Sequence, residues 1–211
     1  MSFLFYLFML FLWERWYMGG SLSPVRYFRR ADVRRRARHA LDLNPAAYDA
    51  RVDLARDALE RGRPAAAETL LAPIVSRDDT AEIVRMHGEA LLGVGRHEEA
   101  VTAFRKALDV DRREVESRLG LAKSLSALKR WEEASVAIET FRVTRPGDAR
   151  GSWAESAIRR GGGDGPAALE SLRELIREQR LKPGYAKRRD RKWSFKARAA
   201  LLFGRPPTRA W

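Results

Sequence analysis

Small and apolar residues recur in the middle of the chain at helical spacing, and the whole set recurs at a longer fixed period. The clearest copy consists of Gly88, Gly95, Ala100, Phe104 and Ala107. A copy 34 residues further on has Ala122, Lys129, Ala134, Ile138 and Phe141, and one about 33 residues earlier has Ala55, Gly62, Ala67, Leu71 and Ile74. Residues three and four apart share a helix face, and glycine between two such segments marks a turn. The pattern predicts antiparallel helix pairs that repeat along the chain.

This pattern resembles the tetratricopeptide repeat, a helix pair of about 34 residues. Two helices approach closely only where small side chains lie at their crossing, and the next pair then covers the apolar face that is left open. The resemblance covers roughly residues 30–180. It implies an all-α, helix-pair solenoid of about three to four repeats, with a concave face that holds another protein.

Turn and capping residues place the first helices. Ser23 and Pro24 form an N-cap and first-turn pair, so a basic helix is expected from there to about Leu43, standing as half a repeat before the first full one. The helices of the first full repeat are expected near 47–61 and 64–77. Pro73 lies inside the second of these and removes one backbone hydrogen bond, which predicts a kink.

The remaining elements follow from the same period. The later repeats are expected at about 81–114, 115–148 and 149–180, and the last of them is the weakest and contains an enlarged GGGDG turn. A basic helix at about 186–203 is expected to cap the stack through apolar positions spaced by three or four residues, namely Trp193, Ala197, Ala200 and Leu201. The predicted domains are 1–19 (hydrophobic anchor), 20–46 (basic N-terminal cap), 47–180 (repeats) and 181–211 (basic helix and tail).

The N-terminal segment MSFLFYLFMLFLW carries no charge and one polar side chain, Ser2. As a helix it would be about 20 Å long, or about 27 Å if it continued to Met18, whereas the hydrocarbon core of a bilayer is about 30 Å thick. Positive charge follows the apolar run, and small residues at a cleavage site are missing, so the segment is expected to be a membrane anchor rather than a signal peptide. The sequence leaves open whether residues 1–18 span the bilayer, lie in its interface, or pack on the repeats or a partner.

The direction of this anchor follows from the charge distribution. The positive-inside rule places the arginines and the repeats on the cytoplasmic side. Bacterial membrane-anchored repeat proteins of envelope assembly are similar in layout, which implies a bacterial inner membrane with the repeats facing the cytoplasm.

The net charge of +13 is not spread evenly. Residues 43–179 contain 22 Lys and Arg against 24 Asp and Glu, a net charge of −2. The excess therefore lies in two flanks, 26–38 and 180–198, in which arginine and lysine are opposed only by Asp32 and Asp190. Basic segments beside a bilayer attract anionic lipid. The predicted membrane and anionic-lipid contacts are Trp13, Trp16, Tyr17, Arg29, Arg30, Arg34, Arg35 and Arg36.

A partner groove follows from the resemblance, because the first helix of each repeat lines the concave face. The family's groove positions fall on Arg56, Glu82, Arg85, Met86, Glu89, Glu116, Leu119, Lys123 and Trp153. Several of these could instead only solvate a helix surface, and Trp153 could either anchor a partner or pack in the core. The best known peptide-binding members hold a C-terminal carboxylate with paired asparagines and lysines. Because Asn44, outside the repeats, is the only asparagine, that activity is not expected here.

Catalytic and metal-binding patterns are weak. Histidine occurs only at positions 39, 87 and 97, without ligand spacing, and the chain has no cysteine. The glycine run at 161–165 lacks the Lys-Ser/Thr of a phosphate loop and follows no strand, so it is better explained as a turn. We therefore expect no enzymatic activity, no cofactor, no metal and no small-molecule substrate.

The predicted function is that of a membrane-tethered adapter that binds a protein or peptide partner in its concave groove. Nucleic acid is the alternative partner, because the arginine helices and the C-terminal KRRDRKWSFKAR could contact phosphates while Trp193 and Phe195 stack on bases. Against this alternative, the chain carries no RNA-binding module signature.

Overall fold

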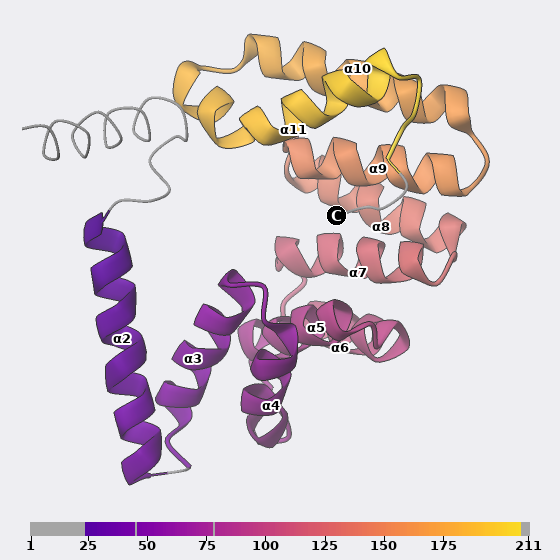
Figure 1. Cartoon of the computed structure of the whole chain (residues 1–211). Helices are drawn as coiled ribbons and strands as arrows, with labels where there is room; N and C mark the ends of the chain where they lie inside the picture. The colour runs from indigo at the N-terminus through magenta and orange to yellow at the C-terminus, as the bar shows by residue number, and fades with distance from the viewer. Residues whose placement is uncertain (1–23, 45, 78, 208–211) are drawn as a thin grey trace, which may run out of the picture. The chain divides into compact units, whose positions relative to one another are not determined.

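The computed structural model describes residues 24–44, 46–77 and 79–207, which form ten α-helices and no strand within those ranges (Figure 1). The helices are α2 (Pro24–Leu43), α3 (Tyr48–Glu60), α4 (Pro64–Val75), α5 (Ala81–Val94), α6 (His97–Val110), α7 (Val115–Ala127), α8 (Trp131–Thr144), α9 (Ala149–Gly161), α10 (Gly165–Leu181) and α11 (Gly184–Leu202). The chain divides into two compact units, Met1–Asp53 and Leu54–Trp211.

The predicted membrane anchor at residues 1–19, with Trp13, Trp16 and Tyr17, lies outside the described ranges. Among the helices that are described, none combines the length and the apolar character that a bilayer crossing requires. The anchor therefore stays a prediction.

The first unit contains α2, which begins at Pro24 as its turn residues predict. Asp32 accepts from the guanidinium groups of Arg35 (3.1 Å) and Arg36 (2.6 Å), one turn further along the same helix. Both arginines are highly exposed, and exposed pairs of this kind stabilise a helix by about 0.3–0.5 kcal/mol. Their main effect is to offset part of the dense positive charge of α2.

The second unit is a stack in which each helix from α4 onward packs on the next, up to α11. First helices of successive repeats also touch, α5 against α7 and α7 against α9. This arrangement is the helix-pair solenoid that the period predicts, and Figure 1 shows its last repeats between α7 and the yellow C-terminal end.

The repeating small and apolar residues form the core of the stack. Ala55, Ala67, Leu71, Ala100, Phe104, Ala107, Ala122, Ala134 and Phe141 are all 0% exposed. Phe104 belongs to a cluster against which Leu121 of the following repeat packs, and Phe141 belongs to the next cluster together with Ile158 of the repeat that follows it. Each large side chain is therefore shared by neighbouring repeats, as the packing argument requires.

The turn inside each repeat has one residue in the left-handed region, and the period places it. Gly62 (φ 66°), Gly95 (φ 88°), Lys129 (φ 62°) and Gly163 (φ 93°) occupy the same repeat position. Left-handed backbone is strained for every residue except glycine, so the third repeat tolerates a strained lysine where the others have glycine.

The expectation of an enlarged fourth turn is wrong. Three residues separate α9 from α10, the same number as separate α7 from α8. The extra glycines are absorbed by the helix ends, because Gly161 is the last residue of α9 and Gly165 the first of α10. Gly161 is required there by packing, since a Cβ would lie 2.3 Å from the ring of Trp131.

Pro73 lies within α4, in its last turn. A proline interior to a helix removes the hydrogen bond that its own N–H would make. Here the helix ends at Val75, two residues after the proline and before the predicted end at 77. The missing hydrogen bond therefore belongs to the last turn of the helix.

Helix α11 closes the C-terminal end of the stack. Trp193 contacts Trp153 of α9 with ring centroids 5.7 Å apart, and Ala197 is fully buried beside Leu172 and Leu175 of α10. Ala200 and Leu201 pack on the same cluster. The four positions expected to form the cap are confirmed as its contact face.

Candidate protein-binding face

The first helices α5, α7 and α9 lie side by side in the second unit and present equivalent positions on one face. We call this surface the first-helix face and define it by the polar residues Glu82, Arg85, Glu89, Glu116, Lys123 and Arg150. A spacing of 34 residues relates Glu82 to Glu116 and Arg150, and Glu89 to Lys123. The repeat therefore arranges charged side chains in rows across the stack.

Three of the nine predicted groove residues have their side chains inside the protein. Met86 and Leu119 are buried in the core, and Trp153 is 8% exposed in the cluster that α11 covers. A buried side chain presents no surface to a partner, so these three residues contribute to the face by supporting it. Trp153 therefore packs in the core, which is one of the two roles that the sequence allowed for it.

The strongest interaction on this face joins two successive repeats. Arg150 at the start of α9 donates from Nη1 and Nη2 to the two carboxylate oxygens of Glu116 on α7, at 2.7 and 2.9 Å. It also donates to Asp148, its neighbour at the α9 N-cap, at 2.8 Å. The hydrogen bonds with both carboxylates raise the pKa of Arg150 above its ordinary value, and the bond with Asp148 has the larger effect. A planar guanidinium held by two carboxylates is a rigid element of the surface.

A second set of pairs lies nearer the N-terminal end of the face. Arg85 donates to Glu89 on the next turn of α5 at 2.5 Å, and its Nε lies 3.5 Å from Glu114. Arg56 of α3 donates to Glu82 of α5 at 2.8 Å. The Arg56 and Glu82 side chains are 45% and 57% exposed, and a pair this open is worth little to stability. Its charges therefore remain accessible to a partner.

Lys123 differs from the other cations of this face. Among the described residues no carboxylate lies within 4.0 Å of its ammonium group. Burial, followed by the nearby charge of Arg150, lowers the pKa of Lys123, while Glu89 and Glu116 oppose the shift from longer range. The half-buried ammonium is thus a donor without a fixed carboxylate acceptor in the described part of the chain, which is an incomplete arrangement.

The nine sequence-predicted residues omit Arg150, which is central to the observed face. The repeat period could have identified Arg150, because this residue stands 34 residues after Glu116 and so holds the second groove position of the fourth repeat. Glu114 and Asp148 could not be found in this way. They precede α7 and α9 as N-cap residues and reach the face only through the fold.

The face offers hydrogen bonds and charge rather than reactive groups. Within the described residues, no three His, Asp or Glu side chains gather to hold a metal ion. The first-helix face is therefore best suited to recognising polar and charged groups of another molecule.

The predicted lipid contacts on α2 are placed only in part. Arg34, Arg35 and Arg36 lie on this helix, and Arg35 and Arg36 share Asp32. The side chains of Arg29 and Arg30 lie outside what the structure describes. Lipid contact at these residues stays a prediction.

Comparison with known families identifies the repeat. Profiles described as tetratricopeptide repeat match residues 91–152 and 49–73. Together with the geometry of the helix pairs, these matches establish that the chain carries tetratricopeptide repeats. No curated protein is significantly similar to the chain in sequence.

Several solved structures share the fold. TTC0263, a thermophilic repeat protein of Thermus thermophilus, is 17% identical with a TM-score of 0.65, over 84% of this chain and 93% of that chain. YrrB, described as a repeat protein with an unusual peptide-binding site, is 15% identical with a TM-score of 0.63, over 83% and 86%. MamA of Desulfovibrio magneticus RS-1 is 18% identical with a TM-score of 0.57, over 74% and 93%. At these identities the likeness establishes the fold.

Proposed function

We propose that this protein is a scaffold that binds a segment of a protein partner along the first-helix face, and that Lys123 receives an acidic side chain of that segment. The observation that carries the proposal is the half-buried Lys123 ammonium without a carboxylate within 4.0 Å in the described part of the chain. An incoming carboxylate would restore the charge-assisted bond that this group lacks.

The rest of the face suits such a segment. Glu116 and Arg150 are locked together at 2.7 and 2.9 Å beside Lys123, so this part of the surface is held in place before a partner arrives. Prior ordering reduces the conformational entropy that binding must overcome. The exposed Arg56 and Glu82 at the other end add charges of both signs, which select a partner by its charge pattern. Peptide binding by a protein of this fold is described for YrrB.

The scaffold is further proposed to be tethered to a membrane through residues 1–19, with the repeats on the cytoplasmic side. The support is the uncharged apolar run followed by the arginines of 26–38. Membrane fractionation of the full chain and of a version without residues 1–19 tests the tether, with separate washes in high salt, alkaline carbonate and nuclease. Release of the full chain by salt would exclude an inserted anchor, and release by nuclease would favour the nucleic-acid alternative.

Site-specific crosslinking tests the binding face. A photoreactive amino acid placed at Glu82, which is 57% exposed on α5, should capture a partner in cells, whereas the same group at Val136 or Val143, which are exposed on α8, should not. Capture from α8 alone would move the binding surface to the second helices and contradict the proposal.

Two substitutions then test the recognition itself. Lys123→Met and Arg85→Glu should each reduce recovery of the crosslinked partner about tenfold, the cost of one lost charge-assisted contact. Lys106→Met is the matched control, because Lys106 is an exposed lysine on the second helix α6 that pairs with Asp79. Trp153→Ala is unsuitable, since its burial would confuse lost binding with lost stability. Unchanged recovery with Lys123→Met would remove this residue from the site.

A further inference from the structure

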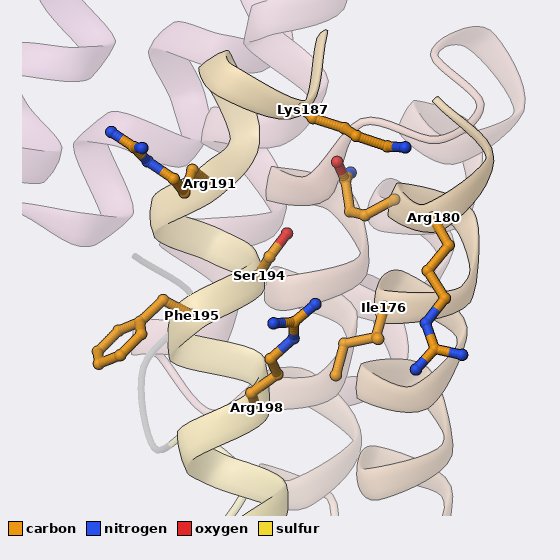
Figure 2. Close-up of a pocket in the computed structure, with 8 residues that line it drawn as sticks. Ile176, Arg180, Lys187, Arg191, Ser194, Phe195 and Arg198 are labelled. Atoms are coloured by element: carbon orange, nitrogen blue, oxygen red, sulfur yellow. The ribbon is translucent and has the colours of Figure 1, made fainter. Parts of the chain in front are cut away.

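A second candidate site lies away from the first-helix face, in a cavity of about 570 Å³ between α10 and α11 (Figure 2). Four cationic side chains line it, Arg180 from α10 and Lys187, Arg191 and Arg198 from α11, and no carboxylate of the described residues does. A pocket lined by cations from two helices and by no acid attracts an anion. Arginine in particular matches the oxygen geometry of a phosphate group.

The side chains divide between the cavity and the outer surface of α11. Figure 2 shows Lys187 and Arg198 reaching from α11 toward α10. Arg191 and Phe195 point to the other side of α11 in the same view. The cations therefore surround one edge of the helix rather than filling a closed cavity.

A buried acceptor in the wall of the cavity is a second, independent sign of a ligand. Gln179 is 6% exposed, and its Nε2 donates to Asp190 at 3.3 Å. Its Oε1 has no hydrogen-bond partner among the residues that the structure describes, although buried polar atoms are nearly always paired. An oxygen acceptor needs a donor, and the surrounding cations disfavour an ammonium group. The fitting ligand therefore carries a hydroxyl group next to its anionic group.

The outer surface beside the cavity is apolar as well as basic. Phe195 is 73% exposed and Leu202 is 81% exposed, and their separation of seven residues places them on one side of α11. Arg191 lies on the same side of α11 as Phe195 (Figure 2). Leu181, at the end of α10, is also exposed. Large apolar side chains with cations on one helix face are typical of helices that lie in a membrane interface.

We propose that the α10–α11 edge binds the headgroup of an anionic phospholipid that carries hydroxyl groups, with Phe195 and Leu202 entering the interface. The phosphate takes the cationic side chains of the cavity, and a headgroup hydroxyl donates to Gln179 Oε1. The residues of this contact are not those of the first-helix face, so lipid binding here does not depend on the proposed function.

Lipid fits these residues better than nucleic acid. Phosphate oxygens occur in both, and Phe195 could stack on a base. The exposed leucines decide between them, because aliphatic side chains gain from burial in hydrocarbon and have no stacking surface to offer a base. Leu181 and Leu202 are both more than four-fifths exposed.

A local fluorescent reporter tests the proposal in the full chain. Because the sequence has no cysteine, Leu202→Cys provides a single attachment point for an environment-sensitive nitrobenzoxadiazole label, and Val136→Cys on α8 provides the reference. Equimolar phosphatidylglycerol and phosphatidylcholine vesicles should shift the emission of the label at position 202 to the blue, and high salt should weaken the effect. Phosphatidylcholine alone should not shift it.

Charge reversal tests whether the cations of the cavity cause the vesicle-dependent emission shift. Arg180→Glu combined with Arg198→Glu should weaken the vesicle-dependent shift at least about tenfold, since each cation near an anionic surface contributes substantially to binding. Arg63→Glu combined with Arg77→Glu is the control, because it makes the same charge change at exposed positions that flank α4 and should alter the titration by less than about twofold. Matching circular dichroism spectra and melting curves confirm that both variants fold.

Four results would overturn the proposal. Vesicle sedimentation without a shift at position 202 would assign all membrane contact to other segments. A shift of equal size with phosphatidylcholine would remove the anionic selectivity. Displacement of vesicles by a single-stranded oligonucleotide, or binding of free glycerol 3-phosphate as tight as that of vesicles, would make the edge a nucleic-acid or soluble-phosphate site. Weak competition by glycerol 3-phosphate supports the lipid, because the free headgroup lacks the acyl chains that the apolar side chains contact.

Discussion

The phenyl ring of Phe104 on α6 lies directly against the backbone of Gly120 on α7. A Cβ atom on Gly120 would lie 2.3 Å from Cζ and 2.4 Å from Cε1 of that ring. On the other side, a Cβ on Gly88 of α5 would lie 3.0 Å from the same ring. Phe104 is fully buried, so three helices of two successive repeats meet around one side chain.

Gly120→Ala should therefore destabilise the protein. Forcing a methyl group into a packed core costs about 1–3 kcal/mol, which outweighs the gain of up to about 1 kcal/mol in helix propensity. The free energy of unfolding should fall by about 1–2 kcal/mol in chemical denaturation. Gly165→Ala is the control, because nothing lies within 4 Å of the added Cβ there. Phe104→Leu in the Gly120→Ala background should recover part of the loss, and failure to do so would argue against the ring as the cause.

Lys129→Gly should stabilise the third repeat. Lys129 has a φ of 62° at a turn position where the other repeats have glycine, and left-handed backbone costs a non-glycine residue about 1–2 kcal/mol. The greater freedom of glycine in the unfolded chain removes part of this gain, which leaves about 0.5–1 kcal/mol. Thermal unfolding should show the increase, and the reciprocal change Gly95→Lys should produce a decrease. A decrease in both variants would indicate that the Lys129 side chain makes a stabilising contact.

Lys123→Met should make the protein more stable at neutral pH while weakening partner binding. Burial lowers the folded-state pKa of Lys123 below its ordinary value of 10.5, so the unfolded chain holds this proton more tightly. The cost of the charge is fully present below the folded-state pKa and disappears as the pH rises toward 10.5. We expect a gain of about 1 kcal/mol at about pH 7, at the low end of the cost of desolvating a polar group because Lys123 is only partly buried, and a smaller gain at about pH 10. Denaturant titrations at both pH values measure it, and a gain that does not change with pH would assign the effect to packing alone.

Trp193→Ala should strongly destabilise the C-terminal end of the stack. Trp193 packs against Trp153 and the cluster containing Leu172 and Leu175, and truncating a large core aromatic costs about 3–5 kcal/mol, less where the side chain is only partly buried. A loss of about 2–3 kcal/mol in the free energy of unfolding is expected. Phe195→Ala, two residues further on the same helix but 73% exposed, should change stability by less than about 0.5 kcal/mol. Equal losses from both variants would contradict the observed orientation of α11.

The sequence was most informative where one local rule applied in every repeat. Buried alanines and the phenylalanine layer follow from the need for close helix crossings, and Gly62, Gly95 and Lys129 were correctly placed as turns because each stands at the same repeat position. The burial of Trp153 was harder to predict. A tryptophan on the face of a first helix can point to solvent or be covered by a later element, and that depends on α11, whose Trp193 packs on Trp153 of α9 from a later part of the chain.

By itself, the sequence determined the helix pairs, their period, the turn positions and the capping residues of α11, because these depend on side-chain size and helical spacing within about one repeat. Only the tertiary structure decided which charges meet. The bidentate bonds of Arg150 with Glu116, the surroundings of Lys123 and the cationic cavity between α10 and α11 join residues on different helices. Their distances depend on how each repeat is rotated against the next, a quantity that is set by the packing of the whole stack.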